Sequence, residues 1–269
     1  MEFETIRVSA DGAVGQLTLN RPDRLNAIGV ATMQDIGEAA RWFDRRPEVR
    51  VVIVRGEGRA FCAGADLKDP PVAGAAPGEG RSWAERREVG QLGLRMADAV
   101  EQMRAVTIAQ VHGYAVGGGV VLMAACDLRV AAEDAVFSIP EIDLGIPLAW
   151  GGIPRLVREI GPALTKELVL TCRRFTPAEA KAAGFVNRVV PAAALDAEVT
   201  ALAAELAAKP PVPVTITKEH VNAVTRSMGA GLTAFADGDA LLATCFAPES
   251  LDAARAYRER TVGSGKRKG

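Results

Sequence analysis

Length, composition and charge place the chain among ordinary water-soluble proteins. The 269 residues suffice for one large domain or for a domain with an appendage. Hydrophobic residues make up 49%, and 32 basic against 33 acidic side chains leave a net charge of −1, so no nucleic-acid partner is indicated. Four separated cysteines and only two histidines favour neither a disulfide framework nor a metal site. We therefore expect reduced thiols and a cytoplasmic protein without a metal.

No segment of the chain predicts a membrane partner. The first four residues are acidic at two positions and are not typical of a signal peptide. The most apolar stretch, residues 106–128, contains Gln110, His112 and three successive glycines, which suit a membrane-spanning helix poorly.

The first elements in chain order predict a β-α-β unit. Residues 14–19 alternate between apolar and polar side chains, as strands do. A helix ending before Pro47 is predicted by apolar residues at helical spacing, namely Ile28, Met33, Ile36, Ala40 and Phe43. The continuous apolar run at 50–54 is typical of a buried parallel strand. Strand, helix and strand together form the unit.

The same alternation continues in the middle of the chain. Residues 69–80 are rich in Pro, Gly and Ala and predict a mobile loop, which we expect to cover the ligand. A helix follows, with an apolar face formed by Val89, Leu92, Met96, Val100 and Met103. Residues 106–111 predict another buried strand, and the glycines at 117–119 begin a segment short enough to be a buried helix.

The last third changes from mixed to helical patterns. Thr176, Pro177 and Glu179 are typical of a helix start, and residues 185–190 are strand-like. Beyond the prolines at 210–213 only helical patterns remain, near residues 217–228, 231–246 and 249–260. We therefore expect an α/β core over residues 1–205 and a helical region over residues 206–269 whose apolar positions need a partner surface.

Two junctions between a strand and small residues are the candidate sites for chemistry. The G-x-G-x-x-G, P-loop, G-x-S-x-G and H-E-x-x-H motifs are all absent from the sequence. One junction runs from strand 50–54 into Ala60–Lys68, and the other runs from strand 106–111 into Gly117–Gly119. Small residues let a ligand approach the backbone, and two N–H groups there can form an oxyanion hole. Either junction alone is more typical of a tight turn.

Taken together, the junctions and three further segments resemble the crotonase superfamily, the enoyl-CoA hydratase/isomerase family. The resemblance covers nearly the whole chain in five ordered segments, Leu19–Ala27, Ala63–Leu67, Gly113–Gly119, Ala124–Arg129 and Phe137–Gly145. It implies an α/β fold with a repeated β-β-α superhelical core and a helical C-terminal trimerisation region. The implied assembly is a homotrimer, or a hexamer made of two trimers.

The resemblance also implies a substrate and its binding residues. The substrate would be an acyl-CoA thioester, so coenzyme A enters with the substrate and no separate cofactor is implied. By motif position, the N–H groups of Ala65 and Gly118 would form the oxyanion hole, and Gly118→Pro would abolish turnover. Substrate or CoA contacts are implied for Arg24, Leu25, Ala63, Asp66, Leu67, Lys68, Gly117, Tyr257 and Arg260. The last two would reach the CoA of a neighbouring subunit.

The acid-base residues distinguish the reactions of the family. Hydratases of the family carry two glutamates twenty residues apart. Here the second is Glu141, whereas the first position holds Val121, which can neither hold a water nor move a proton. Members with a single glutamate resemble Δ3,Δ2-enoyl-CoA isomerases, in which Glu141 would take a proton from C2 and return it at C4. An apolar pocket would raise its pKa, with walls from Ile139, Ile142, Leu148 and Trp150.

Alternatives to an isomerase stay open at this point. Dienoyl-CoA isomerases carry a second acid where this chain has Ala149, which disfavours that reaction. Val121 leaves open a hydratase in which Glu141 activates water alone, and an acyl-CoA-binding protein with little catalysis. By resemblance, fatty-acid β-oxidation is the default pathway. The remaining polar candidates are interpreted as structural, namely Cys62, His112, Asp127, Glu133, Asp134 and Asp143.

Overall fold

The core of the protein is a six-stranded, mostly parallel sheet in the order β1-β2-β3-β4-β6-β8. The computed structural model describes residues 2–68, 82–230 and 236–263. Only the first pair of strands is antiparallel. The strands are β1 (Ile6–Asp11), β2 (Val14–Leu19), β3 (Val51–Gly56), β4 (Val106–Val111), β6 (Leu128–Ala132) and β8 (Arg188–Val190), and a second parallel sheet pairs β5 (Tyr114–Val116) with β7 (Val136–Ser138).

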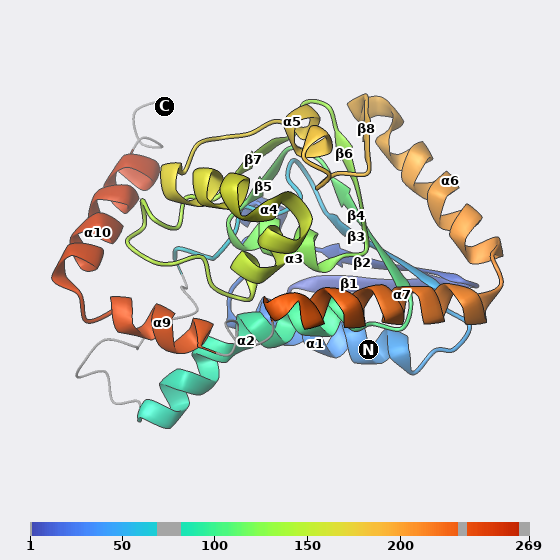
Figure 1. Cartoon of the computed structure of the whole chain (residues 1–269), viewed down its shortest axis with the longest axis horizontal. Helices are drawn as coiled ribbons and strands as arrows, with labels where there is room; N and C mark the ends of the chain where they lie inside the picture. The colour runs from blue at the N-terminus through green and yellow to red at the C-terminus, as the bar shows by residue number, and fades with distance from the viewer. Residues whose placement is uncertain (1, 69–81, 231–235, 264–269) are drawn as a thin grey trace.

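Helices cover both faces of the large sheet (Figure 1). They are α1 (Val30–Asp44), α2 (Trp83–Glu101), α3 (Gly118–Ala125), α4 (Gly152–Thr171), α5 (Pro177–Ala182), α6 (Leu195–Ala208), α7 (Pro211–Thr225), α9 (Asp237–Thr244) and α10 (Pro248–Gly263), with short turns at Pro22–Arg24, Ala192–Ala194 and Arg226–Ala230. Side chains alternate along β3, so Val51 and Ile53 pack in the cluster of α6, whereas Val52 and Val54 pack in the main core with α1 and α2. Burial on both faces explains why these strands are continuously apolar.

Most of the predicted elements are confirmed, and two are corrected. The strand predicted at 185–190 is paired only from Arg188, because Phe185 and Val186 bury their side chains in the main core instead. The helix predicted from residue 217 begins earlier, at Pro211, because a proline in the first turn of a helix loses no hydrogen bond. The loop predicted at 69–80 lies outside the described residues.

The C-terminal helices pack back onto the core of their own chain. Lys218 of α7 donates to Asp127 at 2.7 Å and to the carbonyl of Ala105 at 2.8 Å. Asp127 also accepts from the N–H and the hydroxyl of Thr107. The interpretation of Asp127 as a structural group in a loop is confirmed, and its carboxylate joins α7 to the sheet.

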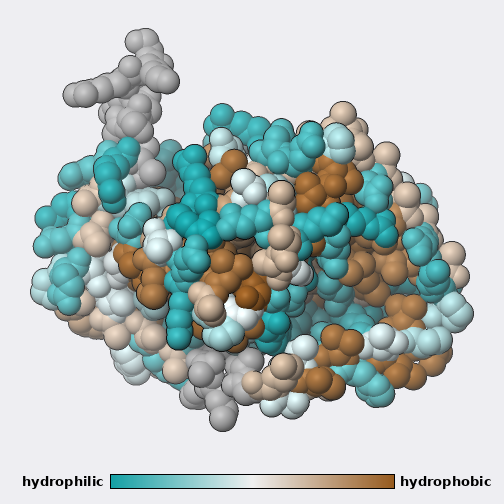
Figure 2. Space-filling model, turned by 45° about the horizontal axis from the view of Figure 1, so that its top comes forward, coloured by the Kyte–Doolittle hydropathy of each residue, from teal (hydrophilic) through white to brown (hydrophobic). Residues whose placement is uncertain are grey.

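Apolar side chains also stay on the surface of α7, where Val212, Ile216, Val221, Val224 and Met228 are exposed. Figure 2 shows hydrophobic residues at the surface between hydrophilic ones. No helix in the described ranges is long and apolar enough to cross a membrane. The division of the chain at residues 205 and 206 stays a prediction, and it falls within the last turn of α6.

Candidate active site

The two predicted junctions lie side by side. After β3, the N–H of Phe61 donates to the carbonyl of His112 at 2.9 Å, and the N–H of Cys62 donates to that of Tyr114 at 2.9 Å. In return, the N–H of Val116 donates to the carbonyl of Cys62 at 3.0 Å. Because of these bonds, the segment around Cys62 lies parallel to β5. The two junctions therefore form one structural unit. Neither junction alone identifies this unit in the sequence.

Glycines bring the two proposed oxyanion donors together. Gly64 has φ +89°, and a Cβ on it would lie 2.6 Å from the carbonyl of Val116 and 3.5 Å from the nitrogen of Gly118. Ile28 bonds to the carbonyl of Gly64 and to the N–H of Asp66, so the N–H of Ala65 points away from this bridge. Gly118 begins α3, where N–H groups have no partner inside the helix. The segments that carry Ala65 and Gly118 are therefore neighbours, and the oxyanion hole itself stays a prediction.

Glu141 lies directly against Gly117, the residue before the second proposed donor. The N–H of Gly117 donates to the carbonyl of Ser138 at 2.9 Å, which ties the end of β7 to the start of α3. A Cβ on Gly117 would lie 2.2 Å from Oε1 of Glu141, so only glycine leaves room for the carboxylate. The side chain of Glu141 is 8% exposed, and its Oε2 has no hydrogen-bond partner within the described part of the chain. Burial raises the pKa of Glu141 from 4.5 to about 7.

Three of the four residues predicted as apolar walls of the Glu141 pocket are buried, and one is not. Ile139, Leu148 and Trp150 are buried as predicted, whereas Ile142 is 42% exposed and is not a wall of a buried pocket. The residue after Glu141 faces outward because a turn starts there, with the N–H of Leu144 bonded to the carbonyl of Glu141 at 3.0 Å. Val121 lies one turn into α3 and is buried, with Cγ2 close to Gly152. The place of the first glutamate in α3 is therefore taken by an apolar side chain.

A pair of arginines holds the loop that carries Ala65. Asp66 is 2% exposed and accepts from Arg21 at 2.9 Å and from Arg24 at 2.6 Å. Burial by itself would raise the pKa of Asp66, but the N–H of Lys68 and the two guanidinium groups lower it. The carboxylate of Asp66 is therefore tied to the side chains of Arg21 and Arg24, and Arg24 stays partly exposed beside it. The contact of Asp66 with CoA stays a prediction.

The turn at residues 21–26 completes this side of the site. Leu25 has φ +50°, and its carbonyl accepts from the N–H of Ala63 at 2.9 Å. Asn26 donates to the carbonyls of Glu57 and Ala60 at 2.9 and 2.8 Å. Sequence reasoning missed Arg21 and Asn26, although both lie in the first matching segment. Leu67 is half-buried and Lys68 exposed at the end of this described stretch.

Helix α10 reaches the same region from the far end of the chain. Burial raises the pKa of Tyr257, and the negative charges of Glu141 and Asp143 raise it further. The guanidinium of Arg260 lies 6.0 Å from the centre of the Tyr257 ring. Tyr257 thus lies near Glu141 of its own chain, and contact with the CoA of a neighbouring subunit stays a prediction for both residues.

The buried thiol and the histidine near the site behave as packed groups. Burial raises the pKa of Cys62 to about 12, which leaves no thiolate at neutral pH. The Nε2 of His112 lies 2.8 Å from the carbonyl of Gly58, a hydrogen bond that keeps the ring at the strand end. In the described ranges, no group of three or more His, Cys, Asp or Glu side chains could hold a metal ion.

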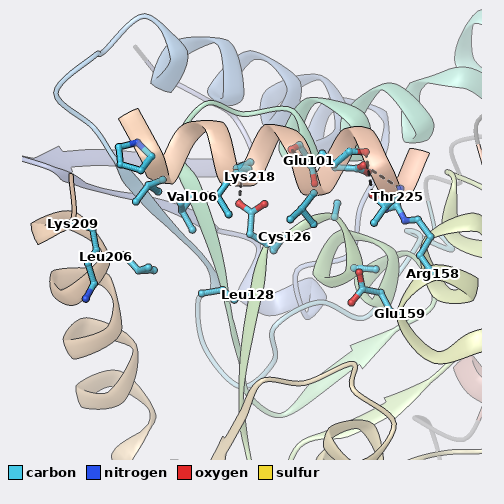
Figure 3. Close-up of a pocket in the computed structure, with 18 of the residues that line it drawn as sticks. Glu101, Val106, Cys126, Leu128, Arg158, Glu159, Leu206, Lys209, Lys218 and Thr225 are labelled. Carbon is cyan, nitrogen blue, oxygen red and sulfur yellow. Dashed lines mark hydrogen bonds and ion pairs between the residues drawn. The ribbon is translucent and has the colours of Figure 1, made fainter. Parts of the chain in front are cut away.

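A separate hollow of about 540 Å³ lies between α7, α4 and the start of β6 (Figure 3). Its walls are mainly apolar, and its charged side chains are paired with one another or with neighbours. Lys218 pairs with Asp127, Arg158 with Glu101, Glu159 with Arg129 and Lys209 with Glu205. Paired charges offer little to an anionic ligand, so the hollow is a poorer candidate than the Glu141 site.

Comparisons with known proteins identify the family of the chain. The sequence model of the family described as "Enoyl-CoA hydratase/isomerase" matches residues 9–261. This chain belongs to that family. The "Delta(3,5)-Delta(2,4)-dienoyl-CoA isomerase, peroxisomal" of Arabidopsis thaliana is 39% identical over 222 residues, which are 80% of this chain and 80% of the relative. A "Short-chain-enoyl-CoA hydratase" of Clostridium acetobutylicum is 32% identical over 263 residues, 97% of each chain.

Solved structures of the same family confirm the predicted fold. The crystal structure of an enoyl-CoA hydratase/isomerase from Xanthobacter autotrophicus Py2 superimposes with a TM-score of 0.85 at 29% identity, covering 96% of this chain and 98% of the other. The predicted crotonase-like α/β architecture is therefore confirmed. The relatives of this family enzyme include both isomerases and hydratases by name.

Proposed function

We propose that the chain is an enoyl-CoA isomerase that moves the double bond of a 3-enoyl-CoA into conjugation with the thioester. The observation that carries the proposal is a single buried carboxylate, Glu141, against the Gly117–Gly118 turn. Val121 fills the place from which a second glutamate would help to add water. A single carboxylate that reaches two carbons of the substrate suits a proton transfer between them better than it suits the addition of water.

In the proposed reaction, the thioester oxygen accepts hydrogen bonds from the N–H groups of Ala65 and Gly118. The carboxylate of Glu141 removes a proton from C2, and the electrons of that C–H bond form a dienolate whose charge develops on the thioester oxygen. Each donor contributes about 3 kcal/mol to the stabilisation of that charge. Glu141 then returns the same proton to C4, which leaves the double bond between C2 and C3 and conserves all atoms.

The protonation of Glu141 suits both half-reactions. With a pKa of about 7, the side chain is ionised and protonated in similar amounts near neutral pH. An acid-base group works best with such a pKa, because it must first accept and then donate a proton. The burial that raises the pKa of Glu141 also keeps bulk water away from the proton that Glu141 transfers.

A hydratase is the second candidate function. The name of the Clostridium relative supports it, and a probable enoyl-CoA hydratase of Mycobacterium tuberculosis is 39% identical over 237 residues, 86% of this chain and 87% of the relative. The unpartnered Oε2 of Glu141 offers a place for one water. Val121 speaks against a hydratase, because it stands where the second carboxylate for hydration is expected.

Two further functions have weaker support. The name of the Arabidopsis relative suggests a dienoyl-CoA isomerase, but Val121 and Ala149 are both apolar and buried. An acyl-CoA-binding protein without catalysis would need no carboxylate beside the oxyanion donors, so Glu141 argues against it.

The assembly and the location belong to the same proposal. A homotrimer, alone or paired as a hexamer, would cover the exposed apolar residues of α7, and light scattering measures the number of subunits. The proposed location is the cytoplasm. The names of two relatives place those proteins in peroxisomes and mitochondria instead.

The deciding experiment offers the purified protein a 3-enoyl-CoA and, separately, a 2-enoyl-CoA. Conjugation is followed by ultraviolet absorbance and the products by mass. We expect the 3-enoyl substrate to be converted, and Glu141→Gln to lower the rate by a factor of about 1,000. Glu133→Gln, in an exposed loop, is the matched control and should keep full activity. A hydroxyacyl product from the 2-enoyl substrate would refute the isomerase, and tight binding without turnover would favour a binding protein.

A further inference from the structure

The indole ring of Trp150 lies in a slot between two glycines on different helices. A Cβ on Gly93 of α2 would lie 2.2 Å from Cδ1 at the pyrrole edge of the indole. A Cβ on Gly118 of α3 would lie 2.1 Å from Cζ3 at the benzo edge. The ring is 7% exposed and thus fills the slot. Its benzo edge touches the residue whose N–H is the proposed oxyanion donor.

The backbone conformation at Trp150 is strained, so other contacts must hold the indole in the slot. Trp150 has φ +60°, which is strained for a residue with a Cβ, and Gly151 follows with φ +72°. Three hydrogen bonds stabilise the turn. The N–H of Gly151 donates to Oδ2 of Asp237 at 2.7 Å, and Arg155 donates to the carbonyls of Gly151 and Trp150 at 3.2 and 3.4 Å.

Asp237 comes from the C-terminal helix α9, 86 residues further along the chain. Figure 1 shows α9 against α2, the helix that also supplies Gly93. The two helices approach closely at Gly90 and Gly238, and Arg87 pairs with Asp239 at 2.9 Å. The carboxylate of Asp237 is partly buried, and burial raises its pKa. One helix pair therefore supplies both a wall of the slot and the acceptor that fixes the turn.

We propose that Asp237 is a positioning residue for the oxyanion hole, because its hydrogen bond to Gly151 holds the Trp150 indole against Gly118. Gly118 has no side chain of its own to fix the direction of its N–H, so the packed indole limits how its peptide can tilt. A donor that tilts away from the developing oxyanion stabilises the transition state less. This inference rests on the proposed function, since it assigns a partner to the oxyanion donor of that reaction.

The first test compares Asp237→Ala, Asp237→Asn and Asp239→Asn. We expect Asp237→Ala to lower kcat about tenfold with a smaller change in KM, because substrate still binds while the donor is misplaced. Asp237→Asn keeps an acceptor oxygen for Gly151 and should restore kcat to within about threefold of wild type. Asp239→Asn removes the ion pair with Arg87 but not the bond to Gly151, and should leave kcat unchanged. An equal loss in Asp237→Ala and Asp239→Asn would refute the proposal, since docking of α9 alone would then explain it.

The second test displaces the indole from the opposite wall without changing α9. Gly93→Ala places a methyl group where the indole lies, and we expect a loss of kcat like that of Asp237→Ala. Gly37→Ala is the matched control, because Gly37 is also inside a helix but has open space at its Cβ position. Full activity in Gly93→Ala would contradict the proposal even if Asp237→Ala did not fold.

A readout without turnover separates this inference from the proposed reaction. In a background where Trp42 and Trp83 are Phe, the fluorescence of Trp150 reports its own surroundings. We expect acrylamide to quench Trp150 more strongly in Asp237→Ala and in Gly93→Ala than in the background protein. If no 3-enoyl-CoA is converted but quenching rises as expected, the proposed function fails and the positioning by Asp237 stands. Unchanged quenching in both variants refutes the positioning.

Discussion

Glu141→Gln should make the protein more stable at alkaline pH while it removes the acid-base group. Burial raises the pKa of Glu141 from 4.5 to about 7. At about 1.4 kcal/mol for each pKa unit, the ionised side chain lowers the free energy of unfolding by about 3 kcal/mol. The folded protein binds this proton more tightly than the unfolded chain does, so wild-type stability falls as the pH rises from about 4.5 to about 7. The neutral Gln side chain avoids that loss.

Urea unfolding at two pH values measures this difference. At about pH 8 we expect the variant to be more stable than wild type by up to about 3 kcal/mol, and at about pH 4.5 the two should be nearly equal. Glu133→Gln, on the exposed loop after β6, should show no comparable gain at alkaline pH. If Glu141→Gln gives the same difference at both pH values, the carboxylate is not buried and desolvated as the structure has it.

Three further predictions concern activity and packing. The rate with 3-enoyl-CoA should rise with pH through about 7 as Glu141 becomes a base, and a pH–rate profile flat across that range would speak against it. Asp66→Asn, which breaks the pairing with Arg21 and Arg24, should cost about 3 kcal/mol in urea unfolding and raise KM. Asp127→Asn should weaken the docking of α7, seen as faster amide hydrogen exchange in Pro211–Thr225, whereas unchanged exchange would place the anchor of α7 elsewhere.

The sequence predicts the parts of the fold in which pattern and burial coincide. The runs predicted as buried strands at residues 50–54 and 106–111 are apolar because both faces of the sheet are covered, and the structure confirms both strands. The glycine junctions were also found, because only glycine fits beside Glu141 and beside the carbonyl of Val116. Helices α4 and α6 were not predicted, since their apolar residues follow no marked cap signal.

Contacts between distant segments could not be predicted from local pattern. Nothing near Asp66 indicates that two arginines from residues 21–24 hold it, and nothing near Gly151 indicates a carboxylate 86 residues away. The structure also changes the meaning of Gly118→Pro. That substitution removes the N–H but places ring atoms where the Trp150 indole lies, so a loss of activity would not isolate the donor. Such effects depend on tertiary packing.

The most direct test of a single buried base follows one labelled proton. A 3-enoyl-CoA that carries deuterium at C2 is converted in ordinary water, and the position of the label is read by mass and nuclear magnetic resonance. Because the carboxylate of Glu141 is buried, we predict a 2-enoyl-CoA that carries part of the deuterium at C4. A hydroxyacyl product, or a 2-enoyl product with no label at C4, would contradict the proposal that Glu141 alone carries the proton.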